Sequence, residues 1–138
     1  MAYTRIELRQ VYDRTSGYCH VCGEKLSFTN YGRPGEKGAW HVDHSKPRAK
    51  GGTDHANNLY AACINCNMEK ATFTTKTARR WHGRPRAPLS RGKREKARRA
   101  NAVACGVIGG IVGSLFGPLG TTIGAGIGAR IGHDIKPD

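Results

Sequence analysis

The stretch from Trp40 to Lys70 reads WHVDHSKPRAKGGTDHANNLYAACINCNMEK, and its pattern decides the fold that we predict. Residues 40–44 and 59–64 are short runs suited to β-strands, and a polar segment that contains proline and glycine separates them. The run from Cys66 to about Lys76 is predicted to be helical. The order strand, strand, helix predicts a small α+β domain.

Two Cys-x2-Cys pairs belong to this stretch: Cys19 and Cys22 precede it, and Cys63 and Cys66 lie at its end. The first ten residues lack the apolar segment of a secretory signal, so we expect a reducing, cytoplasmic location. Four cysteines arranged in this way predict a tetrahedral structural Zn²⁺ site. The alternative is two disulfides in a small secreted protein.

Polar residues with catalytic potential lie between and beside the cysteine pairs: Asp43, His44, Gly51, Gly52, Asn58, Asn67 and Lys70. His44 is separated from Asn58 by 13 residues, and Asn58 from Asn67 by 8. This pattern resembles the HNH (ββα-metal) endonucleases, in the branch whose motif is framed by two zinc-binding cysteine pairs. The resemblance covers about residues 5–71.

The resemblance implies that the protein hydrolyses DNA phosphodiester bonds with His44 as the general base, since a neutral imidazole can take the proton of the attacking water. Asp43 and Asn67 would hold a hard divalent cation, Mg²⁺ or another such as Mn²⁺ or Ni²⁺. Asn58 would hold the loop that orients the base. Asn67 stands where the family often has histidine, which favours a metal that prefers oxygen ligands.

Neighbouring residues raise a geometric question. In a regular strand Asp43 and His44 would point to opposite faces, so they share one site only if the strand bends or ends there. His41 would share the face of Asp43, either as a phosphate contact or as a partly buried strand residue. His20, inside the first cysteine pair, is expected to lie near the metal ligands or at the surface rather than to act in catalysis.

The chain has a formal net charge of +13, and residues 79–100 carry ten basic residues and only Glu95 as an acidic one. Such a segment predicts a polyanionic partner, and we expect mostly nonspecific contacts to DNA phosphates. A solvated basic linker is the alternative. Trp81 would either stack on a base or close the small core. The candidate nucleic-acid contacts are Lys70, Arg79, Arg80, Arg84, Arg86, Arg91, Lys93 and Arg94. A helix is expected to begin near Ser90.

Residues 101–129 contain no charged side chain, and this run exceeds the about 20 residues that a transmembrane helix needs. It resembles the glycine-zipper two-helix segments of bacterial membrane proteins, with Pro118 favouring a hairpin. We expect membrane association, soluble homo-oligomerisation or a disordered or packed extension, and a buried apolar Cys105. The repeating glycines are Gly109, Gly113, Gly117, Gly120, Gly124, Gly128 and Gly132.

The predicted organisation has three parts: an HNH nuclease domain with structural zinc over residues 1–78, a basic helical linker or arm over 79–100, and a glycine-zipper helical hairpin over 101–138. A chain of 138 residues with 38% hydrophobic residues disfavours a TIM barrel or a dinucleotide-binding fold. Two other functions remain open at this stage: a noncatalytic, zinc-dependent nucleic-acid-binding module, and a membrane-active protein that its zinc domain targets. The expected location is the cytoplasm, with the inner face of a membrane as a further option.

Overall fold

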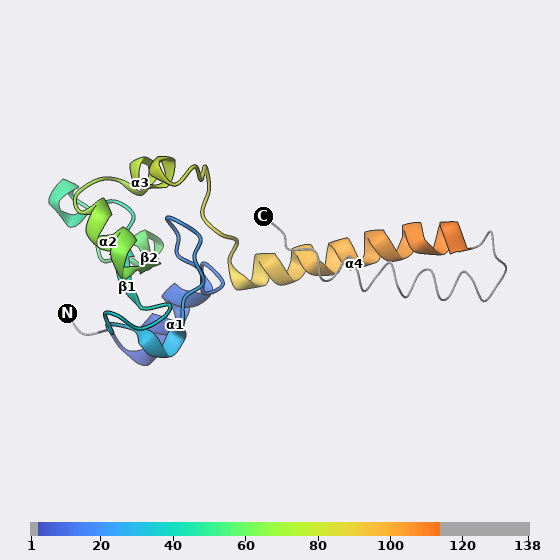
Figure 1. The fold of residues 1–138 in the computed structure, drawn as a ribbon, viewed down its shortest axis with the longest axis horizontal. Helices are drawn as coiled ribbons and strands as arrows, with labels where there is room; N and C mark the ends of the chain where they lie inside the picture. Colours follow the sequence, from blue (N-terminus) through green and yellow to red (C-terminus); the bar gives the residue numbers. More distant parts are fainter. Residues whose placement is uncertain (1–2, 114–138) are drawn as a thin grey trace. The chain divides into compact units, whose positions relative to one another are not determined.

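The computed structural model describes residues 3–113. Its described part is a small α+β structure with one two-stranded antiparallel sheet and four α-helices. The chain divides into two compact units, Met1–Arg91 and Gly92–Asp138. The elements, in chain order and as labelled in Figure 1, are α1 (Arg5–Asp13), β1 (Trp40–His44), β2 (Leu59–Cys63), α2 (Ile64–Lys70), α3 (Thr75–Trp81) and α4 (Arg91–Gly113).

Helix α1 begins at a capping box. The hydroxyl of Thr4 accepts a hydrogen bond from the Glu7 amide, and the Glu7 carboxylate accepts one from the Thr4 amide at 2.7 Å. The helix ends at Asp13, and the chain turns at Gly17, whose φ is +73°. A Cβ at this glycine would lie 2.5 Å from the ring of Tyr12, so only glycine fits the turn.

The sheet confirms both predicted strands. β1 pairs with β2 in antiparallel register, so that Trp40 lies opposite Cys63 and His44 lies opposite Leu59. α2 packs against both strands and completes the expected ββα unit. Trp40 is fully buried, and the ring of Tyr31 meets it at a centroid distance of 5.0 Å. Aromatic packing of this kind supplies much of the apolar burial in so small a core.

The predicted single helix from Cys66 to Lys76 is wrong, because two helices occupy this region. α2 ends at Lys70, and Ala71 adopts φ 43° and ψ −115°, a conformation outside the helical region. The hydroxyl of Thr74 then accepts from the Thr77 amide and begins α3. The threonines that weaken a helix interior here provide a new N-cap.

The helix expected after Ser90 is confirmed as α4, which runs without interruption across the predicted boundary between the basic arm and the tail. Residues 114–138 and the side chain of Cys105 lie outside the described part, so the hairpin stays a prediction. Among the described residues, no helix is long and apolar enough to cross a membrane.

Candidate metal centre and active site

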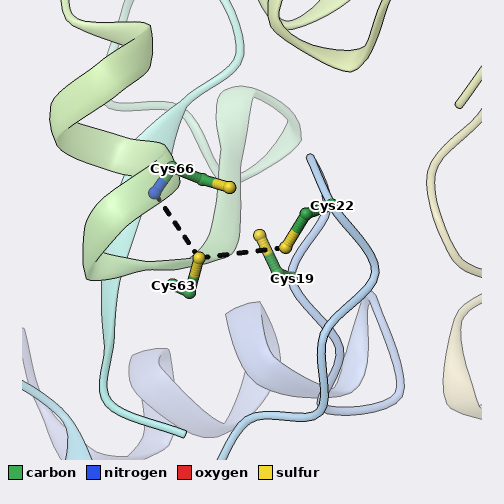
Figure 2. Close-up of side chains that lie close together, drawn as sticks. All are labelled: Cys19, Cys22, Cys63 and Cys66. Atoms are coloured by element: carbon green, nitrogen blue, oxygen red, sulfur yellow. Dashed lines mark hydrogen bonds between the residues drawn. The ribbon is translucent and has the colours of Figure 1, made fainter. Parts of the chain in front are cut away.

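Four cysteine thiols converge from two parts of the first unit. Cys19 and Cys22 lie on the loop after α1, while Cys63 ends β2 and Cys66 lies in the first turn of α2 (Figure 2). All four are free thiols, and their sulfur atoms lie within 4.8 Å of one another. The Sγ atoms of Cys22 and Cys63 are 3.9 Å apart, close to the about 3.8 Å that tetrahedral Zn–S bonds of about 2.3 Å require. The cluster therefore fits a structural zinc ion.

Local hydrogen bonds prepare these thiols for a metal. The Cys66 amide donates to Sγ of Cys63 at 3.4 Å, because Cys63 is the N-cap of α2. A hydrogen bond from Cys22 lowers the pKa of the Cys19 thiol, whereas the hydrogen bond to Cys19 raises the pKa of the Cys66 thiol. A bound cation would favour the thiolate form of all four ligands.

The imidazole of His44 lies at the end of β1 and contacts a carboxylate from the following loop. Nε2 of His44 is 2.7 Å from Oδ1 of Asp54, and the Arg48 guanidinium donates to the same oxygen at 2.6 Å. The hydrogen bond from His44, followed by the one from Arg48, lowers the pKa of Asp54. Sequence reasoning missed Asp54, since no periodicity links it to His44; its acidic side chain just after Gly51 and Gly52 was the only signal.

Asn58 closes the loop that carries Asp54. Its Oδ1 accepts from the Lys46 amide at 2.8 Å, and its Nδ2 donates to the carbonyls of Lys46 at 3.0 Å and Thr53 at 2.8 Å. A Cβ at Gly52 would collide with the Lys46 carbonyl oxygen, so the loop needs a glycine there. Asn58 therefore holds this loop through three hydrogen bonds, and its role in orienting a general base stays a prediction.

Asp43 and His44 do not face the same partners. Asp43 is only 5% exposed, and its two oxygens accept from Nε2 of His20 at 2.7 Å and from Nζ of Lys70 at 2.9 Å. The side chain of Asn67 is half-buried on α2. Asp43 and Asn67 have the oxygen donors that a hard cation prefers. In this arrangement, however, each oxygen of Asp43 accepts a hydrogen bond from a buried donor, so a cation would compete with His20 and Lys70 for the carboxylate.

Several basic residues predicted to contact DNA have internal partners instead. Lys70 is 1% exposed and also donates to the His44 carbonyl at 2.8 Å. Nε of Arg79 donates to the His20 carbonyl at 2.7 Å, and Arg84 donates to the Cys22 carbonyl at 3.4 Å. Burial lowers the pKa of Arg79. Arg80, Arg86, Arg91 and Lys93 are exposed and Arg94 is half-buried.

One of the two roles expected of Trp81, closing the small core, is wrong. Trp81 is 47% exposed and meets Phe73 edge to face at a centroid distance of 5.4 Å. The core is closed instead by Trp40, which the aromatic rings around it cover.

A hollow of about 390 Å³ is lined in part by Ser45, the residue that follows His44. Both lysines that line it, Lys46 and Lys76, are exposed. The other lining residues are all polar: Ser45, Asn57, Asn58, Thr74 and Thr75. The hollow therefore combines positive charge with hydrogen-bonding groups, which suits a phosphate-bearing chain.

Comparison with known proteins agrees with this geometry. Residues 19–73 match the family model described as HNH endonuclease. No curated protein matches the chain. HNH domains are generally found in nucleases and use divalent metals. The match covers both cysteine pairs, the two strands, the loop between them and α2. Residues 19–73 are therefore an HNH endonuclease domain, with four cysteines positioned to bind zinc.

Proposed function

We propose that the protein is a divalent-metal-dependent endonuclease that hydrolyses DNA phosphodiester bonds. The observation that carries this proposal is the 2.7 Å contact between His44 and Asp54 at the end of β1, inside the matched HNH domain. A histidine paired with a carboxylate in this way is a common arrangement for a general base.

The contact assigns different tasks to the two nitrogens of the His44 ring. With the proton on Nε2 donated to Asp54, Nδ1 keeps its lone pair and can accept the proton of an attacking water. The Asp54 carboxylate would then stabilise the imidazolium that forms. Asn58 serves this chemistry by closing the loop between His44 and Asp54.

The substrate is proposed to bind through its phosphates. Lys46 and Lys76 line the hollow that also includes Ser45, the residue after His44. The first three turns of α4 carry six basic residues. Contacts of this type hold the nucleic-acid backbone without reading base sequence. We propose Arg80, Arg86, Arg91, Lys93 and Arg94 as further contacts.

The divalent ion is proposed to be Mg²⁺, with Mn²⁺ or Ni²⁺ as the alternatives. Asn67 offers an amide oxygen of the kind that such ions bind. At Asp43 the ion would compete with His20 and Lys70, which donate to its two oxygens. We therefore assign no step of the reaction to the ion, and the metal requirement is tested by assay.

Residues 101–138 are proposed to bring the nuclease to a membrane or to join copies of the chain in the cytoplasm. The support is the uncharged run over residues 101–129 and its glycine repeat. Flotation of the full chain with anionic vesicles tests the first arrangement, and light scattering of the full chain tests the second. A monomer that fails to float would contradict both.

The decisive experiment is nicking of supercoiled plasmid by the zinc-loaded full chain, with and without Mg²⁺ or Mn²⁺. His44→Ala is expected to lower the metal-dependent rate by about 10²- to 10⁴-fold, the usual contribution of a general base. His55→Ala is the matched control, because His55 is an exposed histidine of the same loop. An RNA substrate in parallel tests the choice of DNA. Tight DNA binding without cleavage under any metal would favour a noncatalytic binding module.

A further inference from the structure

We propose that Asp43, His20, Lys70 and Arg79 form a buried positioning network for His44, and that Asp43 is not a cation ligand. The role in catalysis rests on the proposed nuclease function, while the network itself does not. It joins the first cysteine pair, the catalytic strand β1, α2 and α3.

The network is a continuous chain of short polar contacts. Arg79 Nη2 lies 3.3 Å from Nδ1 of His20, whose Nε2 lies 2.7 Å from Oδ2 of Asp43. Lys70 Nζ donates to Oδ1 of Asp43 at 2.9 Å and to the carbonyl of His44 at 2.8 Å. His20, Asp43 and Lys70 are 0%, 5% and 1% exposed, so water does not replace these contacts.

The donors and acceptors determine the tautomer of His20. A guanidinium only donates hydrogen bonds, so Nδ1 of His20 accepts from Arg79 and carries no proton. The ring proton is therefore on Nε2, where it is donated to Asp43. Arg79 also donates through Nε to the His20 carbonyl at 2.7 Å, and the Tyr60 ring stacks on the imidazole at 5.1 Å. Arg79 thus orients both the backbone and the ring of His20.

The burial of Asp43 and Lys70 explains why both oxygens of Asp43 accept hydrogen bonds. A buried carboxylate and ammonium are stable only when each is paired and its remaining hydrogen-bonding capacity is used. Asp43 receives one donor on each oxygen, and Lys70 reaches two acceptors. A divalent ion that bound both oxygens of Asp43 would compete with His20 and Lys70 for them, and a displaced Lys70 ammonium would keep only the His44 carbonyl as its acceptor. This cost favours a positioning role for Asp43.

The same contacts connect the network to the general base. The bond from Lys70 to the His44 carbonyl holds the backbone from which the imidazole projects. Asp43 is the residue before His44, so the donors that hold its carboxylate also hold the end of β1, while His44 itself contacts Asp54. Arg79 lies in α3, beyond the matched residues 19–73, so an element outside the family match supports the active strand.

The first test is a direct reading of the His20 ring by long-range ¹H–¹⁵N NMR on the zinc-loaded full chain at neutral pH. We expect the ring proton on Nε2 and none on Nδ1, and no movement of the His20 or Lys70 side-chain signals when Mg²⁺ is added. A proton on Nδ1, or displacement of these signals by Mg²⁺, would overturn the proposal. Neither reading requires cleavage, so a protein that binds DNA without cutting it can still pass this test.

The second test measures Mn²⁺ affinity by EPR in Lys70→Met, Asp43→Asn and the double variant. We expect affinities within about twofold of the unmodified protein. If Asp43 were a ligand, Lys70→Met would tighten binding and Asp43→Asn would weaken it about 10- to 100-fold or more. The double variant removes both buried charges together, so neither is left without its partner. Its Mn²⁺ affinity decides the question if the single variants fail to fold.

The third test separates positioning from general stability. Arg79→Met is expected to lower kcat about 10- to 100-fold, as for other residues that orient a functional side chain, with little change in KM. Arg79→Lys should restore only part of the rate, because an ammonium does not supply both the Nε and Nη2 contacts. Arg33→Met, in an exposed loop, is the matched control. An unchanged kcat in a folded Arg79→Met protein would remove Arg79 from the network.

Discussion

Asp43 and Asp54 lie on either side of His44 along the chain, and their surroundings give them different chemistry. Asp43 is buried and shared between His20 and Lys70. Asp54 has a side chain 39% exposed and contacts the His44 imidazole directly. In the proposed mechanism Asp54 would stabilise the charge that develops on His44, whereas the two donors on Asp43 hold that carboxylate in place.

Asp54→Asn is expected to lower the cleavage rate, by less than His44→Ala does. An amide can still accept a hydrogen bond from His44, but it stabilises an imidazolium less well than a carboxylate does. The measurement is kcat for plasmid nicking in both variants. Equal rates for Asp54→Asn and the unmodified protein would remove Asp54 from the mechanism.

The same residue predicts a pH dependence of stability. The pKa of Asp54 lies below its ordinary value of 3.8, chiefly because His44 donates to it. Its stabilising contribution is therefore complete above about pH 3.8 and disappears as the pH falls through the lower, folded-state pKa. Urea unfolding of Asp54→Asn and the unmodified protein should differ at pH 6 and converge in stronger acid. A difference that grows in acid would contradict this assignment.

At the scale of elements, the backbone conformation at the break between α2 and α3 affects the free energy of unfolding. Ala71 has φ 43° and ψ −115°, a combination that glycine adopts without its steric cost. Ala71→Gly is therefore expected to raise the free energy of unfolding by about 1 kcal/mol. Chemical denaturation with zinc bound measures it. A decrease in stability would mean that this backbone is not strained.

In the loop after β1, replacing a glycine is expected to lower stability. Gly52→Ala should destabilise the loop and lower the cleavage rate, because its Cβ would collide with the Lys46 carbonyl that Asn58 also contacts. Gly92→Ala is the control, since a Cβ there meets no atom within 4 Å. Thermal unfolding and nicking rates should separate the two variants. Equal behaviour would show that the loop accommodates a side chain.

At the scale of the whole molecule, the metal centre is expected to hold the first unit together. The cluster joins the loop after α1 to β2 and α2, and the core around it is small. Structural zinc sites in small domains contribute about 10–16 kcal/mol of apparent binding free energy at neutral pH. A strong chelator should therefore abolish cooperative unfolding, with one zinc released per chain. Retention of a cooperative transition without zinc would contradict the structural role.

Helix α4 predicts how DNA affinity depends on salt. Lys93, Lys96 and Arg99 are exposed on it, and their joint replacement by Gln should reduce the salt slope by about 0.9 for each DNA phosphate that they neutralise. The charge-matched control replaces three exposed basic residues of the first unit, Arg5, Arg33 and Lys37. Fluorescence anisotropy over a salt series measures both. Equal slopes for the two triple variants would show that α4 acts only through net charge.

Local signals in the sequence determined much of this protein. The spacing of the four cysteines predicted the metal centre, because each pair depends on near neighbours in the chain. The capping box of Thr4 and Glu7 at the start of α1 is a signal of the same local kind. The two strands of the ββα unit were likewise readable from short runs of residues.

Only the tertiary structure decided the partners of Asp43, Asp54 and Arg79. Each partner comes from another segment of the chain or from across a loop, and neither residue periodicity nor charge indicates which donor meets which acceptor. The helix break at Ala71 was missed for a related reason: weak local preferences near the threonines allowed either one helix or two. The packing of α3 onto α2 and the contact of Arg79 with His20 accompany the second arrangement.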